Sequence, residues 1–202
     1  FYEKGDEPLE FISTRQWFIK ILENKNTLVE QGKKVKWHPE HMFKRYEQWV
    51  EGLNQDWCIS RQRFFGVPFP VWYKLDAQGE PDYDNPIFAS KEQLPLDPQV
   101  TNPVSYSEEQ RGQPNGFMAD PDVMDTWATS SVSPQISSHW KGNDGRHAKL
   151  FPADLRPQAH EIIRTWAFYT ITKSWMHEDK IPWHNIAISG WVVNPDKKKM
   201  SK

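Results

Sequence analysis

The sequence predicts an α/β protein with a parallel sheet, because expected strands alternate with expected helices along the chain. One observation is the apolar stretch IPWHNIAISGWVV at 181–193, in which Gly190 separates 185–189 from 191–193 and which is typical of a buried strand leading to a loop. A second is the stretch PEHMFKRYEQWVEGLN, in which apolar residues recur every three or four positions, as on one helical face: Met42, Tyr46, Trp49, Val50 and Leu53. Ligands of such sheets bind beyond the carboxyl ends of the strands, which is where the lysine-rich loop at the end of the sequence would emerge.

The first part of the chain is expected to contain one extended segment and two helices. The extended segment lies around Trp17–Leu22, and a short helix follows that ends near Gly32. The helix with the apolar face described above then leads into DWCISRQRFFG at 56–66. We therefore treat residues 1–55 as a segment that leads into a second part, 56–202.

The segment 74–116 is expected to be an irregular, surface-lying insertion. It has no apolar periodicity and is rich in proline, acidic and amide residues. Regular structure should resume at FMADPDVMDTWATSSV and pause in the polar loop SSHWKGNDGRH. A helix is then expected to begin near Pro157, since proline is favoured in first helical turns, with Ile162 and Trp166 on one face.

Composition limits the class of protein. With 202 residues and 37% hydrophobic content, the chain can form one globular domain with a sizeable core. The net charge of −2 gives no whole-surface attraction to nucleic acid, so contact with a polyanion must come from local patches. Cys58 is the only cysteine, which excludes an intrachain disulfide and argues against a thiolate zinc site. No apolar run is long enough for a membrane span and no secretory signal is present, so we expect a cytoplasmic location.

Four lysines stand near the end of the sequence, at positions 197, 198, 199 and 202. Such a run is by itself a solvated tail or a nonspecific nucleic-acid patch. Beside a nucleotide site, however, Lys199 and Lys202 would be suited to clamp a polyphosphate as its charge redistributes. The rest of the sequence decides between the two interpretations.

Four segments in this order resemble the class I aminoacyl-tRNA synthetases, and within that family its valine-specific members: DWCISRQRFFGVPFPVWY, DPDVMDTWATSS, RPQAHEIIRTWAF and SGWVVNPDKKKMSK. The resemblance covers nearly the whole chain and implies the second half of a split Rossmann-like catalytic domain, whose ATP signature and most of whose editing insertion lie upstream of Phe1. It also implies that valine and ATP, with Mg²⁺, form valyl adenylate, and that the valine then moves to tRNA(Val). We expect a monomer with no dedicated metal site and no activity from the fragment alone.

The resemblance also assigns residues to the nucleotide. Lys199 and Lys202 would stabilise the phosphates as pyrophosphate leaves, and Ser201 belongs to the same signature. The backbone of Gly190, Trp191 and Val192 would meet the adenine. Two further candidates for the ribose and phosphate, Gln158 and His160, stand near the expected helix start, where free amide donors face anions; a surface capping role is the alternative. Lys197 stands where the family often has glycine.

Trp127, Ile162 and Trp166 match positions that wall the amino-acid side chain in the valine-specific enzymes. Two indoles and an isoleucine suit a small branched side chain, although ordinary core packing is the competing interpretation. Glu161 replaces the usual aspartate, so its role in positioning the pocket is an open expectation.

Three alternatives stay open. The first is an isoleucine-specific enzyme, which shares DWCISRQR but typically carries a Gly-Ser-Asp-Gln signature where this chain has PQAHEIIRTW. The second is a noncatalytic RNA-binding module that uses the lysines. The third is a metal-dependent hydrolase built on aspartates and histidines, for which Asp122 and Asp125 are better explained as turn or helix caps.

Overall fold

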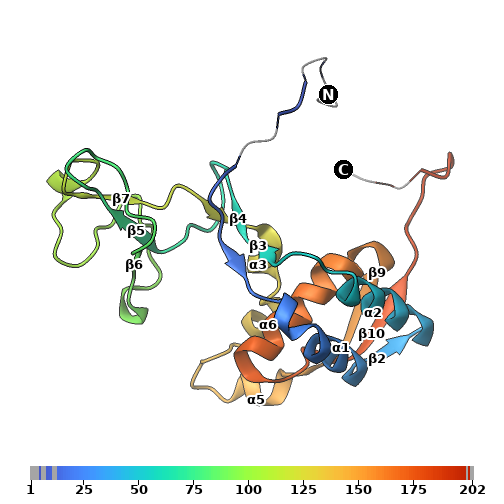
Figure 1. The fold of residues 1–202 in the computed structure, drawn as a ribbon. Coiled ribbons are helices and arrows are strands. Elements are labelled where there is room, and N and C mark those ends of the chain that lie inside the picture. The colour runs from blue at the N-terminus through green and yellow to red at the C-terminus, as the bar shows by residue number, and fades with distance from the viewer. Residues whose placement is uncertain (1–4, 6–7, 11–12, 199, 201–202) are drawn as a thin grey trace.

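The computed structural model describes residues 5, 8–10, 13–198 and 200. The chain forms two lobes (Figure 1). The main lobe contains a parallel sheet with the helices that pack on it, and the small lobe, residues 71–119, is an antiparallel sheet with long loops. No helix among the described residues is long and apolar enough to cross a membrane.

The main sheet has the strand order β2-β10-β9, with β2 at Lys36–His38, β10 at Trp183–Ser189 and β9 at Ala153–Ala159. Both pairings are parallel. The predicted α/β class with a parallel layer is therefore confirmed, and the strand expected in the closing apolar stretch is β10, the central strand. The strand ends at Ser189, so residues 191–193 lie in the loop that follows it.

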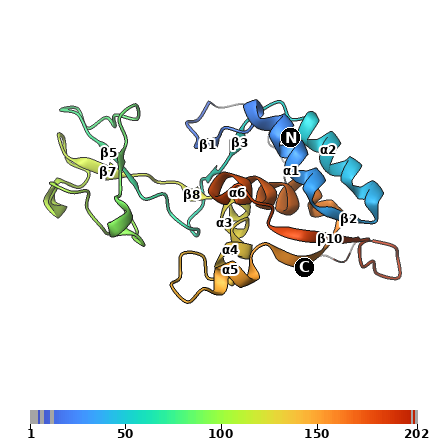
Figure 2. The same cartoon turned by 90° about the horizontal axis from the view of Figure 1, so that it is seen from below.

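Three helices pack against this sheet through one hydrophobic core: α1 (Lys25–Lys34), α2 (Phe43–Glu51) and α6 (Phe168–Glu178). Figure 2 shows α1 and α2 on the same side of the sheet as α6. The face predicted for α2 is confirmed, since Tyr46 and Val50 are fully buried and Met42, Trp49 and Leu53 pack against the core. Helix α1 ends two residues beyond the expected Gly32.

Gly32 lets α1 and α2 approach closely. A Cβ atom at this position would lie 2.2 Å from Cε1 of Tyr46. The Tyr46 hydroxyl also donates a hydrogen bond of 2.8 Å to the carbonyl of Leu28. Gly32 was expected to mark the end of the helix. Its role is instead to allow close packing of α1 against α2.

The helix expected to begin at Pro157 is a wrong prediction. Residues 153–159 form β9, and helical structure begins at His160 with the 3-10 turn η5 (His160–Ile162). The π-helical turn η6 (Ile163–Ala167) follows and continues into α6. Proline lacks a backbone donor, and an edge strand tolerates that loss; β9 has one neighbour, β10, among the described strands.

The small lobe has the strand order β6-β5-β7, with β5 at Val71–Lys74, β6 at Ile87–Phe88 and β7 at Phe117–Ala119. Between the end of β5 and β7 the structure has only β6 and the short 3-10 turns η3 (Lys91–Gln93) and η4 (Glu108–Gln110), and most of 74–116 is irregular. It does not simply lie on a surface, however, because Ile87, Leu96 and Tyr106 pack against a core of the small lobe. That core contains the fully buried Trp72 and Phe117, which flank the segment.

Short elements join the lobes. Strand β1 (Phe18–Ile19) pairs with β3 (Trp57–Cys58), and β4 (Ser60–Arg61) pairs with β8 (Val123–Met124). Helices α3 (Thr126–Ser130), α4 (Ser133–Ser137) and α5 (Arg146–Leu150) follow, and 3-10 turns precede α1 (η1, Leu22–Asn24) and α2 (η2, Glu40–Met42). The expected division at residue 55 stays a prediction; β2 from the first part pairs with β10 from the second.

Candidate active site

The carboxyl ends of β9 and β10 lie side by side. The two strands run parallel, and their last residues, Ala159 and Ser189, are register partners. The chain continues from these ends into His160 and Gly190, two positions predicted for nucleotide contact. Because ligands of parallel sheets bind beyond this edge, we place the candidate site here.

His160 and Trp191 meet just beyond the strand ends. Their rings lie 4.8 Å apart at an interplanar angle of 31°, and His160 Nδ1 lies 3.4 Å from the carbonyl oxygen of Ser189. Trp191 remains 47% exposed and Val192 74% exposed. The structure therefore brings together two predicted residues that follow different strands, and it leaves Trp191 accessible to a ligand.

Gln158 has a different position from the one predicted. It lies inside β9 and not at a helix start, so free helix amides do not explain a contact with phosphate. Its side chain is buried, and no described residue gives its Oε1 atom a hydrogen bond. Of the residues predicted for the ribose and phosphate, His160 does stand at the start of the helical segment, in η5.

The loop after Val193 folds back on itself. Backbone amides of Lys197 and Met200 donate to the carbonyls of Asn194 (2.9 Å) and Val192 (3.1 Å). Lys197 has a φ of +60°, in the left-handed region that favours glycine. This conformation explains why glycine is usual at that position in the family. The predicted residues Lys199, Ser201 and Lys202 lie outside the described residues.

The residues predicted to wall the amino-acid side chain come from elements that contact each other. Trp127 lies in α3, which packs against both η6 and α6, and Ile162 and Trp166 lie in η5 and η6. Trp127 and Trp166 are half-buried and pack against the main core. A π-helical turn in this place is notable, since such turns occur frequently at functional sites.

Arg156 is a residue that the sequence did not suggest. Its guanidinium carbon lies 3.6 Å from the centre of the Trp166 ring, and the Trp166 ring also stacks on Trp183 at 5.2 Å and 13°. Burial lowers the pKa of the Arg156 guanidinium. The sequence gives no sign of this cation–π contact, because only the fold of β9 and η6 brings Arg156 and Trp166 together.

Other sequence interpretations can now be checked. Asp125 occupies the N-cap position of α3, but its side chain makes no capping hydrogen bond and faces Arg61. Asp122 accepts a hydrogen bond from Gln62, and burial raises the pKa of its carboxyl group. Cys58 is half-buried.

Two cavities lie away from the strand ends. One of about 490 Å³ is lined by residues such as Trp17, Tyr73 and Asp120, and another of about 390 Å³ by residues such as Trp57 and Tyr169. None of the predicted site residues lines either cavity. We give more weight to the strand ends, because position relative to the sheet has a physical basis that cavity size alone lacks.

Comparison with known proteins identifies the class. Residues 4–202 match the family model described as tRNA synthetases class I (I, L, M and V). A solved structure of Mycobacterium tuberculosis methionyl-tRNA synthetase bound by methionyl-adenylate has a similar fold, with a TM-score of 0.55 and 17% identity over 91% of this chain and 28% of that chain. The agnB2 LeuRS of Agrobacterium radiobacter K84, solved in a ternary complex with tRNA and LeuAMS, gives 0.52 and 25% identity over 73% of this chain and 21% of that chain.

The chain therefore belongs to the class I tRNA synthetases, as the resemblance predicted. Its similar curated relatives are valine--tRNA ligases: the proteins from Salinispora tropica, Thermobifida fusca and Cutibacterium acnes are 57%, 55% and 55% identical over 100% of this chain. The chain spans 24%, 23% and 24% of the length of these three relatives.

Proposed function

We propose that this chain is part of an enzyme that activates valine with ATP and transfers it to tRNA(Val). The observation that carries the proposal is identity of 52–57% to valine--tRNA ligases over the whole chain. The geometry supports the same reaction, since His160 and Trp191 meet beyond the carboxyl ends of two parallel strands. Monomeric state and a cytoplasmic location are part of the proposal.

In the activation step, a carboxylate oxygen of valine attacks the α-phosphorus of ATP. The bond between that phosphorus and the bridging oxygen breaks, and pyrophosphate leaves with the bonding electrons. Lys199 and Lys202 lower the barrier by meeting the negative charge that grows on the leaving group. The backbone at Gly190–Val192 holds the adenine, and Gln158, His160 and Ser201 contact the ribose and phosphate.

Magnesium in this proposal arrives with ATP, because Mg²⁺ is usually held by substrate phosphates and a few carboxylates. Among the described residues, no group of three His, Cys, Asp or Glu side chains is arranged to hold a metal ion. The donor set of this chain thus fits a cation that the triphosphate carries. Its own contribution to the phosphates is positive charge from lysine.

The amino-acid side chain of the substrate lies against Trp127, Ile162 and Trp166, with Glu161 positioning the pocket. Half-buried indoles on two contacting elements offer apolar walls of fixed shape. An isoleucine-specific enzyme is the closest competing proposal, because the family model includes enzymes of both specificities.

Valine-dependent exchange of pyrophosphate into ATP tests the proposal. The full-length protein that contains this chain should turn over with valine and much less with isoleucine. Preferred turnover with isoleucine would contradict the assigned substrate. The chain 1–202 alone should give no exchange, since catalysis requires all of the preorganised groups; exchange by the fragment would show that the groups are wrongly assigned.

A further inference from the structure

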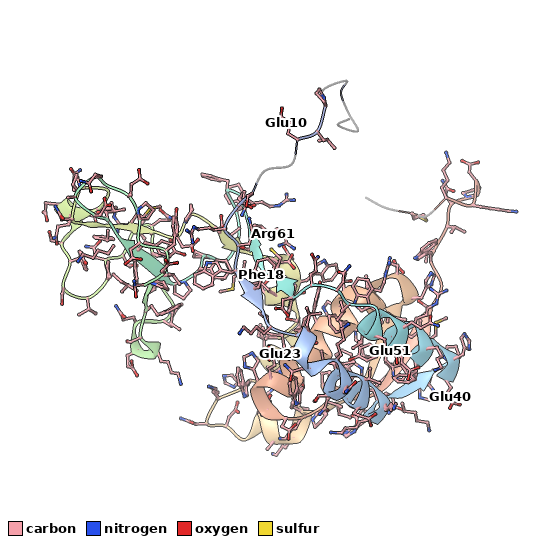
Figure 3. All side chains as sticks on the ribbon, viewed as in Figure 1. Glu10, Phe18, Glu23, Glu40, Glu51 and Arg61 are labelled. Atoms are coloured by element: carbon pink, nitrogen blue, oxygen red, sulfur yellow. The ribbon has the colours of Figure 1, made fainter. Side chains whose placement is uncertain are left out.

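Arg61 lies where the two lobes join and reaches the start of α3 (Figure 3). Pairing of β4 with β8 sets Arg61 opposite Val123, two residues before Asp125. One guanidinium nitrogen, Nη1, donates to the carbonyls of Ser60 (2.7 Å) and Cys58 (3.1 Å). The other, Nη2, lies 3.4 Å from Oδ2 of Asp125.

Asp125 is a buried carboxylate, with a side chain that is only 8% exposed. No described residue gives its Oδ2 atom a hydrogen bond, so Arg61 is the cation that balances it at ion-pair distance. A buried charge that loses its partner is strongly unfavourable. The charge of Arg61 thus favours the observed position of the Asp125 side chain.

The backbone of Asp125 is held from both sides. Its amide donates a hydrogen bond of 2.6 Å to the carbonyl of Ile59, next to β4. Its carbonyl accepts from the amides of Ala128 (2.8 Å) and Thr129 (3.2 Å) and so begins α3. A helix of five residues is too short to fix its own orientation, so this anchor sets the direction in which α3 leaves.

Tyr169 of α6 and Trp57 of β3, the strand that precedes β4, pack against each other. Their rings stack at 3.8 Å and 6°. Burial raises the pKa of Tyr169, and the charge of Asp125 raises it further while that of Arg61 lowers it. The ion pair itself connects β4 with the start of α3.

We propose that Arg61 is a positioning residue for amino-acid selectivity: through Asp125 it fixes α3 so that Trp127, two residues further on, stands as a wall of the amino-acid pocket. The inference rests on the proposed function. Arg61 lies outside the proposed pocket, in β4, which pairs with β8. Its effect on the substrate therefore passes through Trp127.

The test uses the full-length protein and pyrophosphate exchange with valine and isoleucine. Arg61→Met should lower kcat/KM for valine about tenfold, mainly through KM, and should reduce the preference for valine over isoleucine by a similar factor, since contacting residues couple by amounts of this order. Arg61→Lys should keep part of both, because the charge remains. Asp125→Asn should shift the preference in the same direction as Arg61→Met.

Two comparisons separate positioning from a merely structural role. In the Arg61→Met background, Trp127→Phe should change the valine preference no further, because the wall has already lost its position. Independent, additive effects on that preference would overturn the inference. The matched control is Arg111→Met, which removes another half-buried arginine that donates to the carbonyls of Pro98 and Thr101. It should lower stability and leave the preference unchanged.

The outcomes also distinguish the inference from the proposed function. A parent protein that does not activate valine overturns the proposed function and this inference with it. A parent that activates valine while Arg61→Lys, Arg61→Met and Asp125→Asn all keep its preference overturns the inference alone. If Arg61→Met does not fold, Arg61→Lys and Asp125→Asn decide the question through the same measurement, the ratio of kcat/KM for valine to kcat/KM for isoleucine.

Discussion

The guanidinium of Arg156 lies 3.6 Å from the centre of the Trp166 ring, and so β9 is tied to the π-helical turn that follows it. Arg156→Met in the full-length protein removes a cation–π contact of about 1 kcal/mol. The indole should then be held less firmly, and KM for valine should rise about fivefold with a smaller change in kcat. Steady-state pyrophosphate exchange measures both constants.

A second arginine–tryptophan pair supplies the control. The guanidinium of Arg164 lies 5.5 Å from the centre of the Trp49 ring, on the side of α2. Arg164→Met should leave KM for valine unchanged. Equal effects of the two substitutions would show that the Arg156 contact has no special relation to the pocket.

Trp166→Ala should raise KM for valine and loosen discrimination against larger side chains, because a wall of the proposed pocket is lost. Since Trp166 also stacks on Trp183, we expect a loss of stability of about 3 kcal/mol as well. The comparison variant is Trp175→Ala, which removes another half-buried indole that packs on the same core. Loss of stability in both variants with unchanged valine kinetics would make Trp166 an ordinary core residue.

Lys199→Ala and Lys202→Ala should each slow adenylate formation about a hundredfold, which corresponds to ~3 kcal/mol of lost transition-state stabilisation. Lys197→Ala should cost little, because we interpret that side chain as solvated. Lys197→Gly should match the parent, since glycine adopts the φ of +60° without strain. Single-turnover measurements isolate the chemical step; similar small losses at all three lysines would return the loop to a solvated tail.

High pH should weaken the junction between the lobes. The Tyr73 hydroxyl donates a hydrogen bond of 2.6 Å to Asp120, which also accepts from the indole of Trp17 at 2.7 Å. Burial raises the pKa of Tyr73, and the bond to Asp120 raises it further. The folded state therefore keeps this proton at pH values where the unfolded chain, with a tyrosine pKa of about 10, has lost it.

It follows that the stabilisation from Tyr73 is complete below about pH 10 and is lost as the pH rises from there through the raised pKa of the folded state. Tyr73→Phe should cost about 1 kcal/mol at pH 8 and should make the loss of stability between about pH 10 and 11 shallower. Thermal unfolding of parent and variant at several pH values measures the difference. Parallel curves would contradict the assignment.

Local patterns predicted α1, α2 and the central strand β10. The face of α2 follows from spacing within one stretch of sequence, and Tyr46 and Val50 are buried as that spacing requires. Pro157 misled the prediction, because proline suits both a first helical turn and an edge strand, and only the pairing of β9 with β10 decides between them.

Contacts between distant residues could not be predicted in this way. Trp72 and Phe117 form one core although 44 positions lie between them, and no periodicity connects them. The same holds for Arg61 with Asp125. The motifs did indicate His160 and Trp191, and the structure adds that they meet; their chemical roles stay predictions.

The chain enters the small lobe through β5 and leaves it through β7, and these strands are neighbours, since Trp72 pairs with Ala119. Because these two ends are already fastened together, lengthening the chain between them costs little extra closure entropy. Insertions or deletions within 75–116 can thus accumulate over evolution without disturbing the register of β9 and β10. This part of the chain is consequently the natural place for family members to diverge in length, and also the safest position at which to graft a tag or a foreign loop.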